Sequence, residues 1–199
     1  MLTKLPNLLT LSRIVVIAPL VALFWVEGEA ARWIAFGLYV YACLTDFLDG
    51  YIARQLGSVS RWGRFLDPIA DKLLVGALLL MMCAFGRIDD LAVLPAVIIL
   101  MREILVSGLR EFLAEIKVGL PVSRLAKWKT AIQMLALGFL IVGDITPFPA
   151  TQVGEVGLWA AALLTLLTGY DYLRAGSRHM TEADGAEPPA ASAGKHVAG

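Results

Sequence analysis

Residues 46–54 have the sequence DFLDGYIAR and residues 63–71 have the sequence GRFLDPIAD, and these two segments decide the fold. They place four aspartates, Asp46, Asp49, Asp67 and Asp71, in or beside stretches that are otherwise largely apolar. An ionised carboxylate in an apolar, membrane-like setting is costly unless a partner neutralises it. We therefore expect the two segments to face each other and their aspartates to share a partner.

Helical spacing groups these carboxylates into two pairs. Asp46 and Asp49 are three residues apart, and Asp67 and Asp71 are four apart. Residues at these separations share a helix face, with about 5 to 6 Å between Cβ atoms. Carboxylates this close favour protonation unless a cation lies between them, and oxygen ligands suit Mg²⁺ or Mn²⁺. The pattern predicts a divalent metal site. Salt bridges to nearby basic residues are the alternative, and the candidates are Arg54, Arg61, Arg64 and Lys72.

The remainder of the chain is apolar enough for a membrane protein. Of its 199 residues, 58% are hydrophobic and 17% are charged, a larger apolar share than in ordinary soluble domains. Apolar stretches cover residues 7–26, 31–53, 64–85, 91–112, 125–142 and 154–172. Each is close to the roughly 20 residues that cross a bilayer as a helix. We predict an all-α bundle of six transmembrane helices in one domain, residues 1–175, followed by a disordered cytoplasmic tail, residues 176–199.

The basic residues predict an orientation in the membrane. They gather at the N-terminus, around residues 54–64 and 117–129, and near the C-terminus, whereas the other connections hold only Arg32 and Arg87. The positive-inside rule then places both termini and the aspartate end of the bundle on the cytoplasmic side of the cell (inner) membrane. The formal net charge is zero, which provides no basic excess for binding nucleic acid.

The start of the first apolar stretch is unusual because polar residues recur in it. Residues 5–13 have the sequence LPNLLTLSR, with Asn7, Thr10 and Arg13 at helical spacing. We expect this N-terminal segment to lie along the membrane interface before the chain turns into the bilayer. In the alternative interpretation, the polar residues cap a membrane helix and Arg13 extends towards the interface.

The complete pattern resembles the CDP-alcohol phosphotransferase family. It is Asp46-x2-Asp49-Gly50-x2-Ala53-Arg54-x8-Gly63-x3-Asp67-x3-Asp71, and it matches that family at every defined position. The resemblance implies a six-helix membrane enzyme, usually homodimeric, in which the four aspartates hold two Mg²⁺ or Mn²⁺ ions and Asp71 is the general base. It also implies a CDP-binding set, which is Asp49, Gly50, Ala53, Arg54, Gly63 and Asp67. The small residues in this set would in addition let the helices approach closely.

Three further segments, residues 5–13, 102–111 and 127–134, resemble phosphatidylglycerophosphate synthases. That subfamily transfers a phosphatidyl group from CDP-diacylglycerol to glycerol 3-phosphate and releases CMP. A dianionic acceptor needs cationic groups near Asp71, and Arg102 and Arg110 share one face of the fourth predicted helix. The candidate acceptor-binding residues are Arg110, Lys127, Lys129, Arg102, Asn7, Thr10 and Arg13.

Other interpretations of these residues stay open. Lys127 and Lys129 also suit contact with anionic lipid, and Arg102 also suits a buried pair with Glu103 or Glu111. The same donor chemistry would serve another acceptor, as in cardiolipin synthase or phosphatidylinositol phosphate synthase. A divalent-cation transporter is the alternative from a different class, since intramembrane carboxylates also mark ion pathways. The apolar outer segments, residues 34–42 and 73–82, argue against such a pathway.

Overall fold

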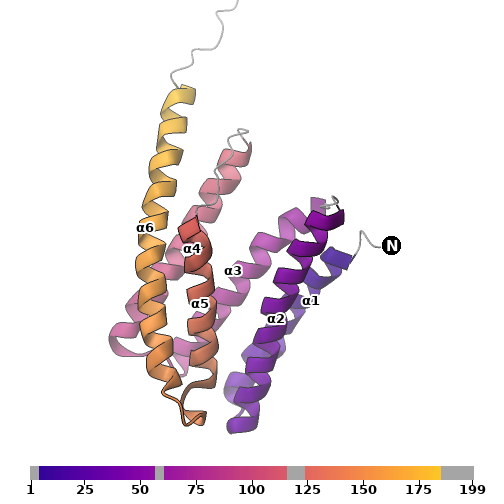
Figure 1. Cartoon of the computed structure of the whole chain (residues 1–199), viewed down its shortest axis with the longest axis vertical. Coiled ribbons are helices and arrows are strands. Elements are labelled where there is room, and N and C mark those ends of the chain that lie inside the picture. Colours follow the sequence, from indigo (N-terminus) through magenta and orange to yellow (C-terminus); the bar gives the residue numbers. More distant parts are fainter. Residues whose placement is uncertain (1–4, 57–60, 116–123, 185–199) are drawn as a thin grey trace, which may run out of the picture.

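The structure, a computed structural model, describes residues 5–56, 61–115 and 124–184, and all long elements in these ranges are helices. Six long helices follow the chain (Figure 1): α1 (Leu5–Ala22), α2 (Glu29–Leu56), α3 (Arg61–Ala84), α4 (Val93–Glu115), α5 (Arg124–Val142) and α6 (Ala150–Asp184). Short 3-10 turns, η2 (Leu23–Trp25), η3 (Asp90–Ala92) and η4 (Gly143–Ile145), join some of them. The predicted all-α fold is confirmed, and each apolar stretch of the sequence corresponds to one long helix.

Within the described ranges, four segments are long and apolar enough to cross a membrane: Asn7–Trp25, Asp90–Ala114, Leu125–Ile145 and Ala150–Tyr170. The other two long helices, α2 and α3, carry the four aspartates, and this charge makes them less typical of a membrane span. Large apolar side chains such as Val15, Leu80, Met101 and Leu163 are exposed along the bundle. An apolar surface of this extent is unusual for a soluble monomer and suits contact with lipid. Six membrane-spanning helices remain a prediction.

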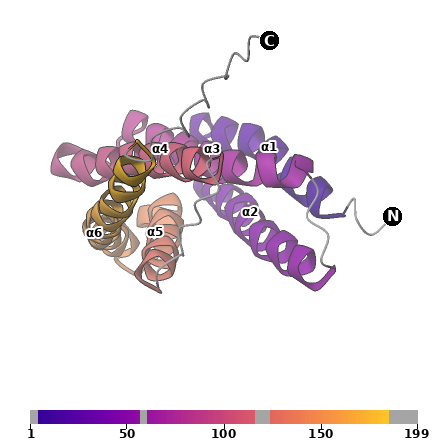
Figure 2. The same ribbon diagram turned by 90° about the horizontal axis from the view of Figure 1, so that it is seen from above.

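The helices form two groups that share one apolar core. Helix α1 packs against α2 and α3, whereas α6 packs against α4 and α5. Contacts of α2 with α5 and of α3 with α4 join the groups, and the view in Figure 2 shows α5 beside α6, apart from α1. The shared core includes buried Leu78, Met82, Ile99, Leu137 and Leu158. Leu20 of α1 and Tyr39 of α2 belong to the same core, so burial of apolar surface also fixes α1, α2 and α3 relative to one another.

Two glycines bring α5 and α6 unusually close. A Cβ atom added at Gly154 would lie 2.7 Å from Leu140 Cγ, and one at Gly157 would lie 2.9 Å from Ala136 Cβ. Small residues are commonly used where membrane helices approach in this way. The contact positions the part of α6 that carries Thr168 and Tyr172, which lie near the candidate site.

Near the two ends of the chain, the structure places Arg13 inside the bundle and extends the last helix past residue 175. Helix α1 is continuous, and its Arg13 side chain is completely buried in the bundle rather than extended towards the interface. The alternative interpretation of Arg13 is therefore wrong, because the guanidinium finds carboxylate partners inside. The interfacial placement of residues 5–13 stays a prediction. Helix α6 continues to Asp184, beyond the expected domain boundary at residue 175, and residues 185–199 of the predicted tail lie outside the described residues.

Candidate active site

One arginine from α1 contacts three of the four aspartates. Arg13 Nη1 donates to Asp46 Oδ1 at 2.6 Å and also to Asp71 Oδ1, while Nη2 donates to Asp49 Oδ2. The Arg13 side chain has no exposed surface, and its Nε has no hydrogen-bond partner. Helices α1, α2 and α3 thus meet at a single guanidinium.

Thr10, one turn before Arg13 on α1, connects the fourth aspartate to this cluster. Its Oγ1 lies 2.5 Å from Asp67 Oδ1 and 3.4 Å from Asp49 Oδ2, and the side chain is buried. The structure therefore brings all four predicted aspartates together around two side chains of α1.

Sequence reasoning missed this role of Thr10 and Arg13. It assigned both residues to the acceptor, and it expected any salt bridges of the aspartates to come from residues nearer in sequence. In the structure, Lys72 Nζ instead donates to the carbonyl oxygen of Pro68 at 2.7 Å. The side chains of the arginines at 54, 61 and 64 lie outside what the structure describes. The available signal was the spacing of Thr10 and Arg13, which places two polar groups on one face of an apolar helix.

Two of the aspartates face a cavity of about 250 Å³ between the two helix groups. The side chains of Asp46 and Asp71 are 40% and 46% exposed, whereas that of Asp49 is 6% exposed. The cavity is also lined by basic side chains from α3, α4 and α5, namely Lys72, Arg102, Arg110 and Lys129. Two carboxylates of the cluster and several cations therefore share one space.

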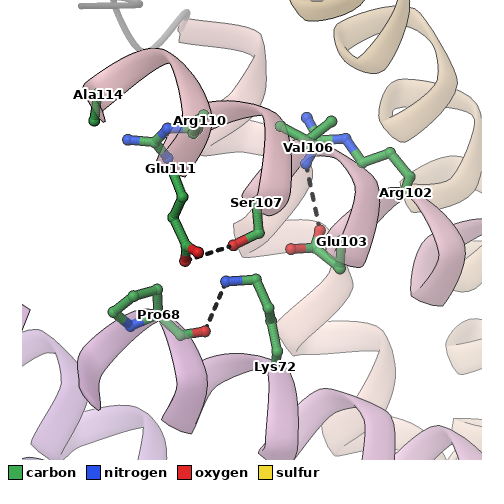
Figure 3. Close-up of a pocket in the computed structure, with 9 residues that line it drawn as sticks. All are labelled: Pro68, Lys72, Arg102, Glu103, Val106, Ser107, Arg110, Glu111 and Ala114. Atoms are coloured by element: carbon green, nitrogen blue, oxygen red, sulfur yellow. Dashed lines mark hydrogen bonds and ion pairs between the residues drawn. The ribbon is translucent and has the colours of Figure 1, made fainter. Parts of the chain in front are cut away.

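A second cavity of about 370 Å³ adjoins this one between α3 and α4. Figure 3 shows its lining, with Arg102 and Arg110 on α4 and with Lys72 and Pro68 on α3. The Arg110 side chain is exposed, and no ion pair joins it to another described residue. On the same helix, Ser107 Oγ donates to Glu111 Oε1 at 3.5 Å. Arg110 lines both cavities, and because its side chain is exposed it is available to an anion.

Other cations of the site are held by protein groups. Lys129 is buried and pairs with Glu103, and Arg102 Nη1 lies 3.4 Å from the same carboxylate oxygen. Arg102 Nη2 donates to Thr168 Oγ1 at 3.1 Å, and its guanidinium carbon lies 5.7 Å from the ring centroid of Tyr172. The predicted alternative for Arg102, a pair with Glu103, is confirmed. Glu103 thus contacts two of the cations that line the cavity of about 250 Å³, which we call the basic cavity.

The remaining predicted site residues are less directly connected to the cavity. Lys127 is exposed and is not among the residues that line either cavity, because it lies two positions from Lys129 and so on another face of α5. Asn7 is half-buried, one turn before Thr10, and Gly63 is buried at the start of α3. Gly50 is half-buried, and the side chains of Ala53 and Arg54 lie outside the described set. Their proposed contacts to acceptor or nucleotide stay predictions.

The chemistry of the four carboxylates fits a divalent cation. In the described part of the chain, no three acidic, histidine or cysteine side chains surround one point closely enough to hold an ion as they lie here. The Arg13 guanidinium lies among the carboxylates and already provides a positive charge. Carboxylate oxygens are the donors that Mg²⁺ and Mn²⁺ prefer. The carboxylate oxygens are therefore suitable ligands for a divalent cation once the Arg13 guanidinium moves away from them.

Comparison with known proteins identifies the family. The family model described as CDP-alcohol phosphatidyltransferase matches residues 3–167. The chain belongs to this family. This CDP-alcohol phosphatidyltransferase is 50% identical over 174 residues to the CDP-diacylglycerol--glycerol-3-phosphate 3-phosphatidyltransferase of Rickettsia prowazekii, covering 86% of this chain and 94% of the relative. It is 36% identical over 188 residues to a cardiolipin synthase (CMP-forming) of Oryza sativa subsp. japonica, covering 87% of this chain and 57% of the relative.

Solved structures share the fold of this CDP-alcohol phosphatidyltransferase. The apo phosphatidylinositol phosphate synthase of Mycobacterium tuberculosis superposes with a TM-score of 0.64 at 22% identity, covering 85% of this chain and 87% of that chain. The same mycobacterial protein has been solved with manganese and citrate and with CDP-DAG bound. The family resemblance inferred from the aspartate pattern is confirmed.

Proposed function

We propose that this enzyme transfers the phosphatidyl group of CDP-diacylglycerol to glycerol 3-phosphate, forming phosphatidylglycerophosphate and CMP in phospholipid biosynthesis. The observation that carries the proposal is the cavity in which Asp46 and Asp71 lie opposite Arg102, Arg110 and Lys129. Acidic groups suited to metal-bound diphosphate and basic groups suited to an anionic acceptor are thus adjacent. Bacterial relatives at about half identity carry the name of this activity.

On the donor side, Asp46, Asp49, Asp67 and Asp71 would hold two Mg²⁺ or Mn²⁺ ions. When bound, the cations neutralise negative charge on the diphosphate of the donor and on the departing phosphate. The chain holds these carboxylates in place through Thr10 and Arg13. The proposed CDP contacts are Asp49, Gly50, Ala53, Arg54, Gly63 and Asp67, on the end of α2 and the start of α3.

On the acceptor side, the basic cavity would bind the phosphate of glycerol 3-phosphate. Arg110 is the best-placed direct ligand because it lines both cavities and forms no ion pair with another described residue. Lys129 and Arg102 add positive charge that Glu103 partly neutralises. A guanidinium and a phosphate form strong charge-assisted hydrogen bonds.

Asp71 is the proposed general base because its carboxylate reaches the same cavity as the cations. It would accept the proton of the acceptor hydroxyl, and the hydroxyl oxygen would attack the lipid-side phosphorus of the donor. The new P–O bond forms as the bond between that phosphorus and the CMP phosphate oxygen breaks, and CMP leaves. Positioning and charge stabilisation provide most of the acceleration in phosphoryl transfer of this kind.

The test is CMP release by the purified protein in the presence of Mg²⁺ and CDP-diacylglycerol. Glycerol 3-phosphate would be compared with inositol phosphate, serine and phosphatidylglycerol as acceptors, with Asp71→Asn as the inactive control. Release with glycerol 3-phosphate alone is the expected result. Release with phosphatidylglycerol alone would favour cardiolipin synthesis, the activity named for the rice relative. Failure with every acceptor would count against an enzyme of this specificity and would make ion transport worth measuring.

We further propose that the protein is a homodimer in the cell (inner) membrane, with its active site and both termini on the cytoplasmic side. The distribution of Lys and Arg supports this orientation, and the apolar helices support the membrane setting. Light scattering of the detergent-solubilised protein would measure the oligomeric state, and a monomer at working concentration would contradict the proposed dimer.

A further inference from the structure

The contacts of Arg13 suggest a role that differs from acceptor binding. Its Nη1 bridges Asp46 Oδ1, at 2.6 Å, and Asp71 Oδ1, so that one nitrogen joins oxygens from α2 and α3. Its Nη2 binds Asp49 Oδ2. A cation ligated by these same oxygens would have to lie where the guanidinium lies or directly beside it.

We propose that Arg13 is an internal counter-ion of the aspartate cluster, whose guanidinium competes with divalent cations and so sets the metal affinity of the site. The proposal rests on the proposed metal dependence of the enzyme. Arg13 acts through the aspartates and is therefore a positioning residue: it holds α1, α2 and α3 together until a cation takes over part of the neutralisation.

Charge and burial support the competition. The Arg13 side chain has no exposed surface, so water screens its interaction with the carboxylates poorly. The other described cations nearby have different partners, since Lys72 binds the Pro68 carbonyl and Lys129 binds Glu103. Arg13 is thus the basic side chain that contacts these aspartates directly within the described residues. Removing its charge leaves the carboxylates more strongly negative, and a divalent cation then binds more tightly.

The structure also indicates how the guanidinium can give way. The Nε of Arg13 is buried without a hydrogen-bond partner. Only the two Nη atoms of the guanidinium therefore hold the side chain in place. Asp67 is bound by Thr10 rather than by Arg13, and Asp46 and Asp71 are partly exposed in the cavity. An incoming cation can therefore reach carboxylate oxygens before the guanidinium has moved.

The experiment measures Mn²⁺ binding to the purified protein without substrates, by electron paramagnetic resonance of free Mn²⁺. Arg13→Gln should lower the dissociation constant of Mn²⁺ about tenfold or more, because a close positive charge is removed. Arg32→Gln is the matched control, since Arg32 pairs with Asp144 at the far end of α2 and should leave Mn²⁺ binding unchanged. Thermal unfolding should show Arg13→Gln less stable than wild type in EDTA and more strongly stabilised by Mn²⁺.

Unchanged or weaker Mn²⁺ binding by folded Arg13→Gln would overturn the inference while leaving the proposed reaction intact. If that variant does not fold in EDTA, folding in Mn²⁺ supports the inference, and failure to fold in both overturns it. Arg13→Lys keeps the positive charge but contacts fewer carboxylates. The affinity of this variant for Mn²⁺ should therefore lie between those of wild type and Arg13→Gln. Absence of Mn²⁺ binding by the wild type would contradict the proposed metal dependence itself, and the inference with it.

Discussion

At the scale of single residues, Asp71 combines two features that bear on catalysis. It belongs to the carboxylate cluster through its contact with Arg13, nearly half of its side-chain surface is exposed, and it lines the basic cavity. Asp49 is also part of the cluster, but its side chain is almost completely buried. The cavity exposure makes Asp71 better placed than Asp49 to accept a proton from an acceptor.

The first prediction concerns Asp71→Asn. We expect CMP release to fall by about 10²- to 10⁴-fold, the usual contribution of a general base. Mn²⁺ binding should weaken but remain measurable, because three aspartates keep their carboxylates. CMP release and Mn²⁺ binding are measured on the same preparation, and near-normal turnover would exclude Asp71 as the base.

The second prediction concerns Glu103→Gln. Lys129 is buried and would lose its carboxylate partner, and breaking a buried ion pair in this way costs about 3 kcal/mol of stability. Glu111→Gln is the control, because Glu111 is exposed and accepts a hydrogen bond from Ser107 at the long distance of 3.5 Å. Thermal unfolding in detergent compares the two variants. Equal shifts in unfolding temperature would mean that Glu103 does not hold Lys129 in place.

At the scale of helices, the approach of α5 to α6 depends on a missing side chain. The third prediction is that Gly154→Ala destabilises the protein by about 1 to 3 kcal/mol, as overpacking does, because the new Cβ would lie 2.7 Å from Leu140 Cγ and 3.1 Å from the Ala136 carbonyl oxygen. Gly37→Ala introduces the same methyl group on α2, where nothing lies within 4 Å. The control should be neutral or stabilising by up to about 1 kcal/mol. Similar unfolding temperatures for both variants would contradict the close packing.

Arg32 and Arg87, which lie outside the basic clusters of the sequence, bind the C-terminus of α5. Arg87 Nη1 donates to the carbonyl oxygen of Ile141 at 3.1 Å, and Arg32 Nη1 donates to that of Val142 at 3.3 Å. The last carbonyls of a helix lack partners within the helix, and positive charge near them is favourable. These arginines therefore have a structural role that explains their presence at the less basic end of the bundle.

The fourth prediction follows from this cap. Arg87→Leu should lower stability by about 1 to 2 kcal/mol, through loss of a hydrogen bond from a charged donor and of the contact with the Phe24 ring, 4.4 Å from the guanidinium carbon. The KM for glycerol 3-phosphate should not change, since Arg87 lines neither cavity near the aspartates. Thermal unfolding and acceptor titration test both statements. A changed KM with unchanged stability would be incompatible with a cap.

At the scale of the whole molecule, the fifth prediction tests the orientation in the membrane. In a background with Cys43→Ser and Cys83→Ser, Glu27→Cys lies between α1 and α2, and His179→Cys lies near the end of α6. A membrane-impermeant maleimide should label Glu27→Cys in spheroplasts, because that connection is expected on the outer side. His179→Cys should react only after the membrane is permeabilised, and the reverse pattern would invert the proposed topology.

Residue types and their spacing along the sequence were sufficient to predict the helices and the carboxylate cluster of this protein. Apolar runs of about 20 residues indicate helices whatever they pack against, and the spacing of the four aspartates indicates a carboxylate cluster because helical geometry places such residues on one face. The family pattern, too, depends on residue type and separation alone. The contacts of Arg13 and Thr10 with that cluster were not predictable in this way. In the sequence, Arg13 is separated from its aspartates by 33 to 58 positions, and Thr10 from its aspartates by 39 to 57. Such long-range contacts form only when buried apolar faces set α1 against α2 and α3, and the same packing separates Lys129, turned into the bundle, from exposed Lys127.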